Sequence, residues 1–149
     1  MDANDFKLKL VEEITNCDEI LGIGQTGDIN APLIEGKSDI DLFDQWYASE
    51  ACRMIDEEEL GRAELRHEVL FYHQVVEEFL DHFLQALYAK NRRYFPSRKR
   101  TERAIAAFER KPQDCYERLL KIVHLGSDEK TIDDSIEELR KLCKELKEL

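Results

Sequence analysis

Two acidic residues, Asp39 and Asp41, lie two positions apart beside a short apolar run that ends at Phe43. The run from Ile40 to Phe43 favours a strand, and in a strand residues two apart point to the same side. Two carboxylates held side by side repel each other, so a divalent cation between them is favourable. Mg²⁺ is the expected ion, because it takes one or two protein carboxylates and completes its coordination with water and phosphate. We therefore expect Asp39 and Asp41 to bind Mg²⁺.

A glycine-containing turn precedes the acidic pair. It follows a second apolar run, Ile20 to Ile23, and consists of Gly24, Gln25, Thr26 and Gly27. Because glycine has no Cβ, the backbone can turn sharply here and bring its N–H groups close to a phosphate, and Ser38 offers a hydroxyl donor. The turn and Ser38 are therefore candidate phosphate-binding groups. The alternative is an ordinary turn in which Ser and Asp side chains cap backbone groups.

A phosphate-holding turn followed by Asp-x-Asp resembles the signature of the DNA polymerase beta-like nucleotidyltransferase superfamily, in which a Gly-Ser or Gly-Gly turn precedes the acidic pair. The match covers Gly24 to Gly27 and Ser38 to Leu42, with Gln25 where the family usually has serine. The chain looks closest to uncharacterised bacterial nucleotidyltransferase-like proteins with a C-terminal helical domain, whose helical part is similar to residues 89–100 and 111–115. The resemblance touches both ends of the chain, and the middle of the family pattern is missing.

This resemblance implies transfer of a nucleoside monophosphate from a nucleoside triphosphate to the hydroxyl of an unknown acceptor, with Mg²⁺ as the cofactor. In the family, two metal ions align the triphosphate and a third carboxylate activates the acceptor. No third strand with a carboxylate is visible in this sequence, so a shortened or degenerate relative is the alternative expectation. The resemblance also suggests that Arg92, Arg93 and Lys99 orient the nucleotide or the acceptor.

A basic segment, residues 90–103, is the second candidate region. It contains a single acid, Glu102, and seven cations: Lys90, Arg92, Arg93, Arg98, Lys99, Arg100 and Arg103. Arginine binds phosphate bidentately, and Tyr94 or Phe95 could stack on a ring. In the alternative interpretation Phe95 fills the helical bundle, and the arginines are favourable beside the negative end of the preceding helix.

Composition limits the classes of function. The chain has 149 residues, of which 42% are hydrophobic, which suits one globular unit. No stretch approaches the roughly 20 apolar residues that cross a bilayer, and the acidic N-terminus has no signal-peptide pattern, so we expect a cytoplasmic protein without a membrane partner. A net charge of −11 opposes non-specific binding to nucleic acid.

The predicted fold class is mainly α, with a small N-terminal α/β remnant of one helix and two short strands packed on an antiparallel helical bundle. Residues 1–48 would form the nucleotidyltransferase-like segment and residues 49–149 the bundle. A stripe of apolar residues predicts one long helix from Arg62 to Lys90 as its spine; the stripe is Leu65, Val69, Tyr72, Val76, Phe79, Leu80, Phe83 and Leu87. Two strands alone are marginal, so their exposed edge could pair with another copy in a homo-oligomer.

Two further helices are predicted at the ends of the chain. The first spans about residues 4–15. The last begins near Thr131 and has an apolar seam formed by Ile132, Ile136, Leu139, Cys143 and Leu146.

Two other functions remain open. The chain could be a non-catalytic helical binding or assembly module that keeps only the front of an enzyme fold. Alternatively, Arg66 and His73, seven residues apart, resemble the catalytic pair of helical-bundle ribonucleases. Glu78 and His82, four apart on one helical face, suit either a metal or a simple hydrogen bond.

If the transferase interpretation is correct, a nucleoside triphosphate with Mg²⁺ should raise the melting temperature, because a ligand that binds only the folded state stabilises it. Replacing Asp39 and Asp41 by Asn should abolish the shift, as measured by thermal denaturation with and without each nucleotide. Melting that no Mg²⁺–nucleotide pair alters would favour the binding module. RNA cleavage that disappears in His73→Ala would favour the ribonuclease.

Overall fold

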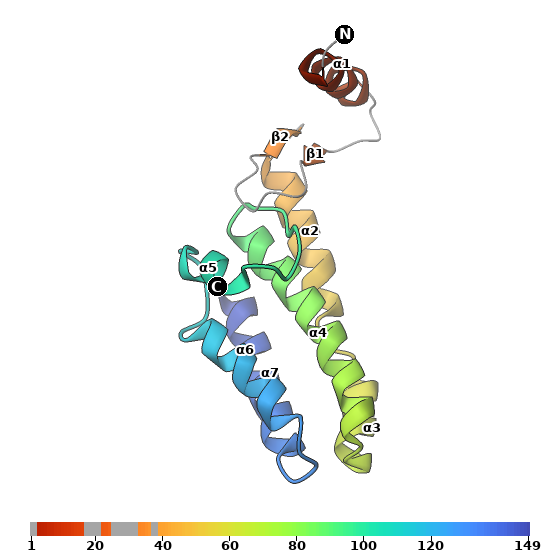
Figure 1. The fold of residues 1–149 in the computed structure, drawn as a ribbon, viewed down its shortest axis with the longest axis vertical. Helices are drawn as coiled ribbons and strands as arrows, with labels where there is room; N and C mark the ends of the chain where they lie inside the picture. Colours follow the sequence, from red (N-terminus) through yellow and green to blue (C-terminus); the bar gives the residue numbers. More distant parts are fainter. Residues whose placement is uncertain (1–2, 17–21, 25–32, 37–38) are drawn as a thin grey trace.

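The computed structural model describes residues 3–16, 22–24, 33–36 and 39–149. Within these residues the chain is mainly helical (Figure 1). The elements are α1 (Ala3–Thr15), β1 (Gly22–Gly24), β2 (Leu33–Gly36), α2 (Asp39–Arg53), α3 (Glu57–Arg66), α4 (Val69–Lys90), α5 (Thr101–Ala106), α6 (Cys115–Leu125) and α7 (Ile132–Glu148). In this part of the chain, none of the helices combines the length and the apolar character that a membrane span requires.

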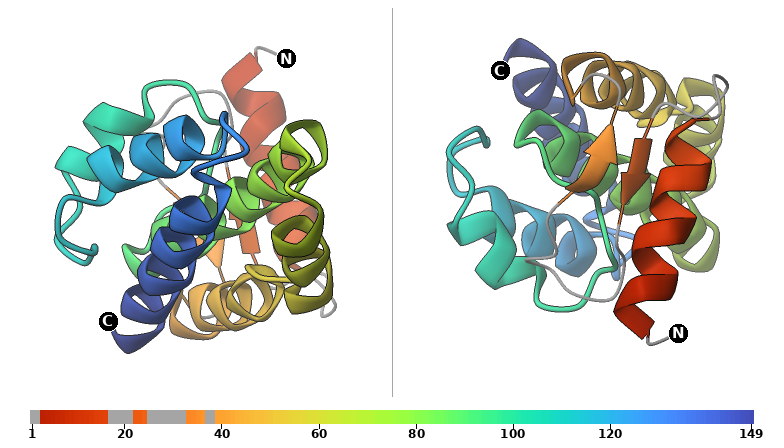
Figure 2. Two further views of the ribbon diagram at one scale, coloured as in Figure 1. Left: turned by 90° about the horizontal axis from the view of Figure 1, so that it is seen from below. Right: turned by 90° about the horizontal axis from the view of Figure 1, so that it is seen from above.

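Helix α4 is the central element of the bundle. It runs antiparallel to α2 on one side and contacts α6 and α7 on another (Figures 1 and 2). Its buried side chains recur every three or four positions, as the apolar stripe predicts. They include Tyr72, Val76, Phe79, Phe83 and Leu87. The neighbouring helices complete the core with Met54, Ile105, Ile122 and the whole predicted seam of α7: Ile132, Ile136, Leu139, Cys143 and Leu146.

The predicted single spine from Arg62 to Lys90 is wrong, because the chain breaks between α3 and α4. His67 ends α3 with a φ of 52°, the left-handed conformation that commonly terminates a helix. Its Nε2 atom lies 3.0 Å from Oδ1 of Asp133, which places the turn against the start of α7. Leu65, assigned to the buried stripe, is 86% exposed as a result.

The predicted α/β remnant packed on the bundle is also wrong. The segment from Ile40 to Phe43, expected as a strand, belongs to the first turns of α2. Helical spacing explains this: Phe43, Glu50 and Ala51 are buried at positions that share one side of α2, so the buried face of the helix already begins at Phe43. The stability gained by burying this continuous helical face exceeds the weak strand propensity of the four residues from Ile40 to Phe43. The proposed boundary between residues 48 and 49 falls inside α2.

The N-terminal elements contribute no sheet layer to the fold. Strands β1 and β2 are three and four residues long and form one antiparallel pair, with Gly22 opposite Gly36. Helix α1, at the position predicted for the first helix, lies beside this pair and away from α6 and α7 (Figure 1). The fold is therefore that of a helical protein. Association through a strand edge stays a prediction.

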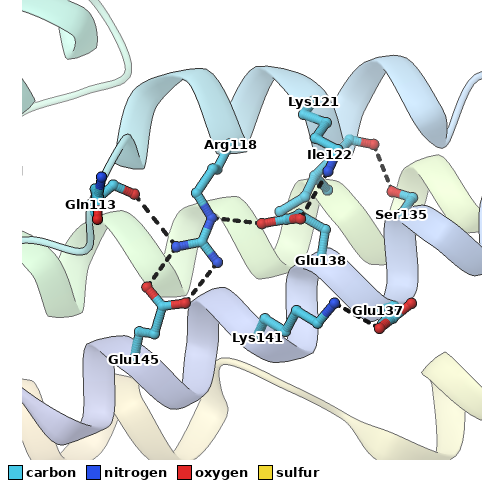
Figure 3. Close-up of polar contacts among 9 residues, drawn as sticks. All are labelled: Gln113, Arg118, Lys121, Ile122, Ser135, Glu137, Glu138, Lys141 and Glu145. Atoms are coloured by element: carbon cyan, nitrogen blue, oxygen red, sulfur yellow. Dashed lines mark hydrogen bonds and ion pairs between the residues drawn. The ribbon is translucent and has the colours of Figure 1, made fainter.

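Polar contacts lock α6 to α7 (Figure 3). The guanidinium of Arg118 donates to Oε1 of Glu138 at 2.6 Å and to both carboxylate oxygens of Glu145 at 2.6 and 2.9 Å. The hydrogen bonds to Glu145 are the main reason why the pKa of Arg118 is raised. Lys121 donates to the second oxygen of Glu138 at 3.0 Å, so both carboxylates that face α6 are neutralised.

A chain of two buried hydrogen bonds joins α4 to α7 and α6. The hydroxyl of Tyr72 donates to Oγ of Ser135 at 2.8 Å, and Ser135 donates to the carbonyl of Ile122 at 2.6 Å. Burial raises the pKa of Tyr72 to about 12, because the charged phenolate is poorly solvated there. The ring of Tyr72 lies against Gly126, where a Cβ would meet its Cε1 atom at 2.6 Å. The end of α6 must therefore be a glycine for α4 to pack this closely.

We predict that Gly126→Ala destabilises the fold by about 1–3 kcal/mol, because the new methyl group overlaps a fully buried ring. The matched control is Gly61→Ala in the middle of α3, where a Cβ would meet nothing within 4 Å. That change should stabilise the protein by about 0.5–1 kcal/mol, since alanine favours a helix over glycine. Urea denaturation of both variants measures the effects. Equal effects in the two variants would contradict this packing at Gly126.

Candidate functional site

The structure places the predicted metal ligands on a helix. Asp39 and Asp41 belong to the start of α2, where successive residues are about 100° apart around the axis, so residues two apart do not share a side. Gly24 ends β1. The other predicted phosphate-binding residues of this region, Gln25, Thr26, Gly27 and Ser38, lie outside the described residues. Mg²⁺ binding by the acidic pair therefore stays a prediction without its strand geometry.

No group of three or more His, Cys, Asp or Glu residues in the described ranges could hold a metal ion. His82 is buried between α2 and α4, where its Nδ1 atom lies 2.6 Å from Oε2 of Glu50. Glu78, the predicted partner of His82, is 3.9 Å from its Nε2 atom. The imidazole of His82 therefore forms a buried polar contact between α4 and α2.

The ribonuclease-like pair is split between two helices. Arg66 ends α3 and lies over the ring of Phe71, with its guanidinium carbon 5.7 Å from the ring centroid. His73 belongs to α4, and its Nε2 atom is 3.4 Å from Oγ of Ser127. Because the chain turns at His67, the seven-residue spacing does not place Arg66 and His73 on one helical face.

The basic segment, in contrast, helps to form a pocket. The pocket has a volume of about 390 Å³ and lies between the end of α4 and the segment that follows α5. One wall consists of Lys90, Asn91, Arg92 and Arg93, and the other of Ala107, Phe108, Glu109 and Arg110. We call this the α4-end pocket. Lys99, the third predicted basic residue, is not among its lining residues.

The end of α4 gives Arg92 an unusual backbone conformation. The N–H groups of Arg92 and Arg93 donate to the carbonyls of Ala89 and Tyr88, at 2.9 and 3.0 Å. These two bonds form a Schellman cap, whose left-handed position is usually occupied by glycine. Arg92 occupies it here with a φ of 57°, at a backbone cost of about 1–2 kcal/mol. An arginine at a position that favours glycine suggests that its side chain has a function.

Asn91 joins the two walls of the pocket. Its Nδ2 atom donates to the carbonyls of Arg110 and Leu87, at 2.7 and 2.9 Å, and its Oδ1 atom accepts from the N–H of Arg110 at 3.0 Å. The amide therefore pairs with the backbone of Arg110 as a neighbouring strand would. Sequence reasoning missed the pairing of Asn91 with Arg110, because the two residues are 19 positions apart and no local pattern links them.

Four cations and one acid, Glu109, line the pocket. The Nζ atom of Lys90 lies 4.1 Å from the ring centroid of Tyr47, and the guanidinium carbon of Arg93 lies 5.8 Å from that of Phe108. Among the described residues, Lys90, Arg93 and Arg110 have no carboxylate within 4 Å. The negative end of α4 carries only about half a charge, so the helix neutralises a small part of this positive charge.

Aromatic rings support the wall that carries Arg93. Phe108 is buried and lies edge-on against Tyr88, with ring centroids 4.8 Å apart. The ring centroids of Tyr88 and Phe95 are 5.2 Å apart. Phe95 packs against the core, as the alternative interpretation of the basic segment predicted. Arg93 thus rests on a fixed ring, which reduces the entropy that its guanidinium would lose on binding a ligand.

A second arginine of the basic segment has a structural role. Arg98 donates to Oδ1 of Asp81 at 2.9 Å and to the carbonyl of Glu77 at 2.7 Å, and it also pairs with the carboxylate of Glu77. These contacts hold the loop between α4 and α5 along the surface of α4. The position of this loop relative to α4 is therefore fixed.

The same loop touches the beginning of α2. The guanidinium of Arg92 lies 3.5 Å from Oδ1 of Asp44 and 5.8 Å from the ring centroid of Phe43. Tyr94 packs on Phe43 and Trp46, with ring centroids 5.1 and 6.0 Å apart. The structure thus brings the basic segment next to the helix that begins with Asp39.

Comparisons with models of protein families, with curated proteins and with solved structures find no match to this chain. The resemblance to nucleotidyltransferases therefore stays a prediction. The α4-end pocket combines a cavity with convergent charge, and the choice of a function starts from it.

We predict that Asn91→Ala destabilises the fold by about 1–3 kcal/mol, because three backbone groups lose their partner. The matched control on the same helix is Gln74→Ala, an exposed position at which a change within about 0.5 kcal/mol is expected. Urea denaturation measures both variants. If Asn91→Ala is as stable as the control, Asn91 does not hold the two walls together.

Proposed function

We propose that this protein is a helical binding module whose α4-end pocket binds a small phosphate-bearing ligand. The observation that carries the proposal is the convergence of Lys90, Arg93 and Arg110 on one pocket, each with no carboxylate within 4 Å in the described part of the chain. In contrast, Arg118 is neutralised by two carboxylates. The positive charge at the pocket is therefore available to an external anion.

Phosphate is the anion that suits these side chains best. A guanidinium group donates two parallel hydrogen bonds to phosphate oxygens, and such charge-assisted bonds are roughly twice as strong as neutral ones. Arg93 is supported by Phe108, and the backbone of Arg110 is held by Asn91, so the Arg93 guanidinium and the Arg110 backbone have defined starting positions. This preorganisation lowers the entropic cost of binding.

The charge of the whole protein favours a small ligand. A net charge of −11 repels a long polyanion, whose charges would extend beyond the pocket over the acidic surface. A small phosphate ester places its charge within a pocket of about 390 Å³. The proposed ligand class is therefore a small phosphorylated molecule.

A nucleotidyltransferase is the second candidate, and one contact favours it. Arg92 reaches α2 at Phe43 and Asp44, so a ligand in the pocket would lie near the helix that begins with Asp39. The two carboxylates are suitable donors for Mg²⁺, but the strand expected to hold them side by side is a helix in this structure. We therefore derive no catalytic step, and the thermal-shift experiment with Mg²⁺ and nucleotides tests this candidate.

The phosphate proposal predicts specific binding of inorganic phosphate. In a titration followed by two-dimensional amide NMR, the largest shifts should occur at Arg93 and Arg110. Arg93→Gln and Arg110→Gln should each weaken the affinity about tenfold or more, because a hydrogen bond to a charged group contributes about 1.5–3 kcal/mol.

The matched control is Arg66→Gln, which removes the same charge at the end of α3. It should leave the phosphate affinity unchanged at fixed ionic strength. Shifts that are absent at the pocket, or an equal loss of affinity in the control, would show that the pocket is not a phosphate site.

A further inference from the structure

The α4-end pocket has two cationic sides with different electrostatic surroundings. On the first side, Arg93 lies over Phe108 and shares the pocket lining with Arg110. On the second side, Arg92 lies toward α2 and pairs with Asp44. The two consecutive side chains thus contact different elements: Arg92 contacts Phe43 and Asp44 of α2, and Arg93 contacts Phe108.

We infer that the pocket takes a ligand with two neighbouring anionic groups, such as a diphosphate ester, and that Asp44 sets its discrimination against a ligand with one. This inference rests on the proposed phosphate-binding function. The first anionic group binds on the side of Arg93 and Arg110. The second binds Arg92, whose guanidinium it must share with, or take from, the Asp44 carboxylate.

The geometry of the Arg92–Asp44 pair allows this exchange. A guanidinium nitrogen of Arg92 lies 3.5 Å from Oδ1 of Asp44, and the side chains of Arg92 and Asp44 are 41% and 67% exposed, respectively. An exposed pair at this distance is weak, because water and salt screen it. A phosphate oxygen can form a shorter, charge-assisted hydrogen bond with the same guanidinium. The ring of Phe43, whose centroid is 5.8 Å from the guanidinium carbon of Arg92, provides a contact that does not involve Asp44.

Asp44 is therefore an internal competitor for one of the two binding groups. A single phosphate that is held by Arg93 and Arg110 leaves the Arg92–Asp44 pair intact. A diphosphate gains the contact with Arg92 only after it has displaced Asp44. Removal of the Asp44 charge should consequently strengthen the binding of diphosphate and leave the binding of phosphate unchanged.

Isothermal titration calorimetry with inorganic phosphate and inorganic pyrophosphate, at equal ionic strength, tests this inference. The variants are Asp44→Asn, Arg92→Gln and the double variant. Asp44→Asn should bind pyrophosphate about two- to five-fold more tightly than the unmodified protein, the range expected for an exposed ion pair. Arg92→Gln should lower the affinity for pyrophosphate toward that for phosphate, and in this background Asp44→Asn should have no effect.

Asp134→Asn is the matched control, because it removes the same charge from an exposed position on α7. A gain in this control as large as that in Asp44→Asn would overturn the inference, because it would reveal a general effect of net charge. A gain for phosphate as large as for pyrophosphate, or one that persists without Arg92, would also overturn it while the phosphate site stands. Failure of the unmodified protein to bind either anion would instead remove the proposed function.

Discussion

Helix α4 must bury apolar side chains on more than one side, and the rest of the bundle follows from this constraint. Its buried residues include Phe79, Phe83 and Leu87 on the predicted stripe, and also Leu84 and Tyr88 outside it. Full burial of one such side chain contributes about 1.5–3 kcal/mol, so no single neighbouring helix can satisfy α4. Helix α2 covers one side, and α6 with α7 covers another (Figure 2). The end of α4 consequently lies where α2 and the segment after α5 come together.

The α4-end pocket is a result of that meeting point. A helix that ends in solvent can satisfy its last carbonyls with water, but α4 ends against other elements and uses specific partners. The Schellman cap requires a left-handed residue, which is Arg92, and the amide of Asn91 holds the backbone of Arg110. The groups that terminate the helix therefore also position the cations, and stability and the proposed ligand binding would depend on the same residues.

The charges of the protein divide according to role. Arg98 and Arg118 are paired with two carboxylates each and hold elements together. Lys90, Arg93 and Arg110 lie at the pocket on an otherwise acidic protein, where the negative net charge discourages large polyanions. This division favours a binding function over a purely structural one for the basic segment. It does not depend on the transferase hypothesis, whose acidic pair begins a helix in this structure.

The sequence by itself determined the features that depend on local spacing. The helices near residues 4–15 and after Thr131, the buried seam of α7 and the basic segment from residue 90 all follow from periodicity or composition, because a regular apolar repeat defines which face a helix buries. Tertiary structure decided the features that depend on which faces meet. Burial of Phe43 against Tyr94 favoured a helix from Ile40 to Phe43, although four such residues alone prefer a strand. The partners of Asn91 and Arg92 lie 19 and 48 positions away, and local spacing carries no information about such distant contacts.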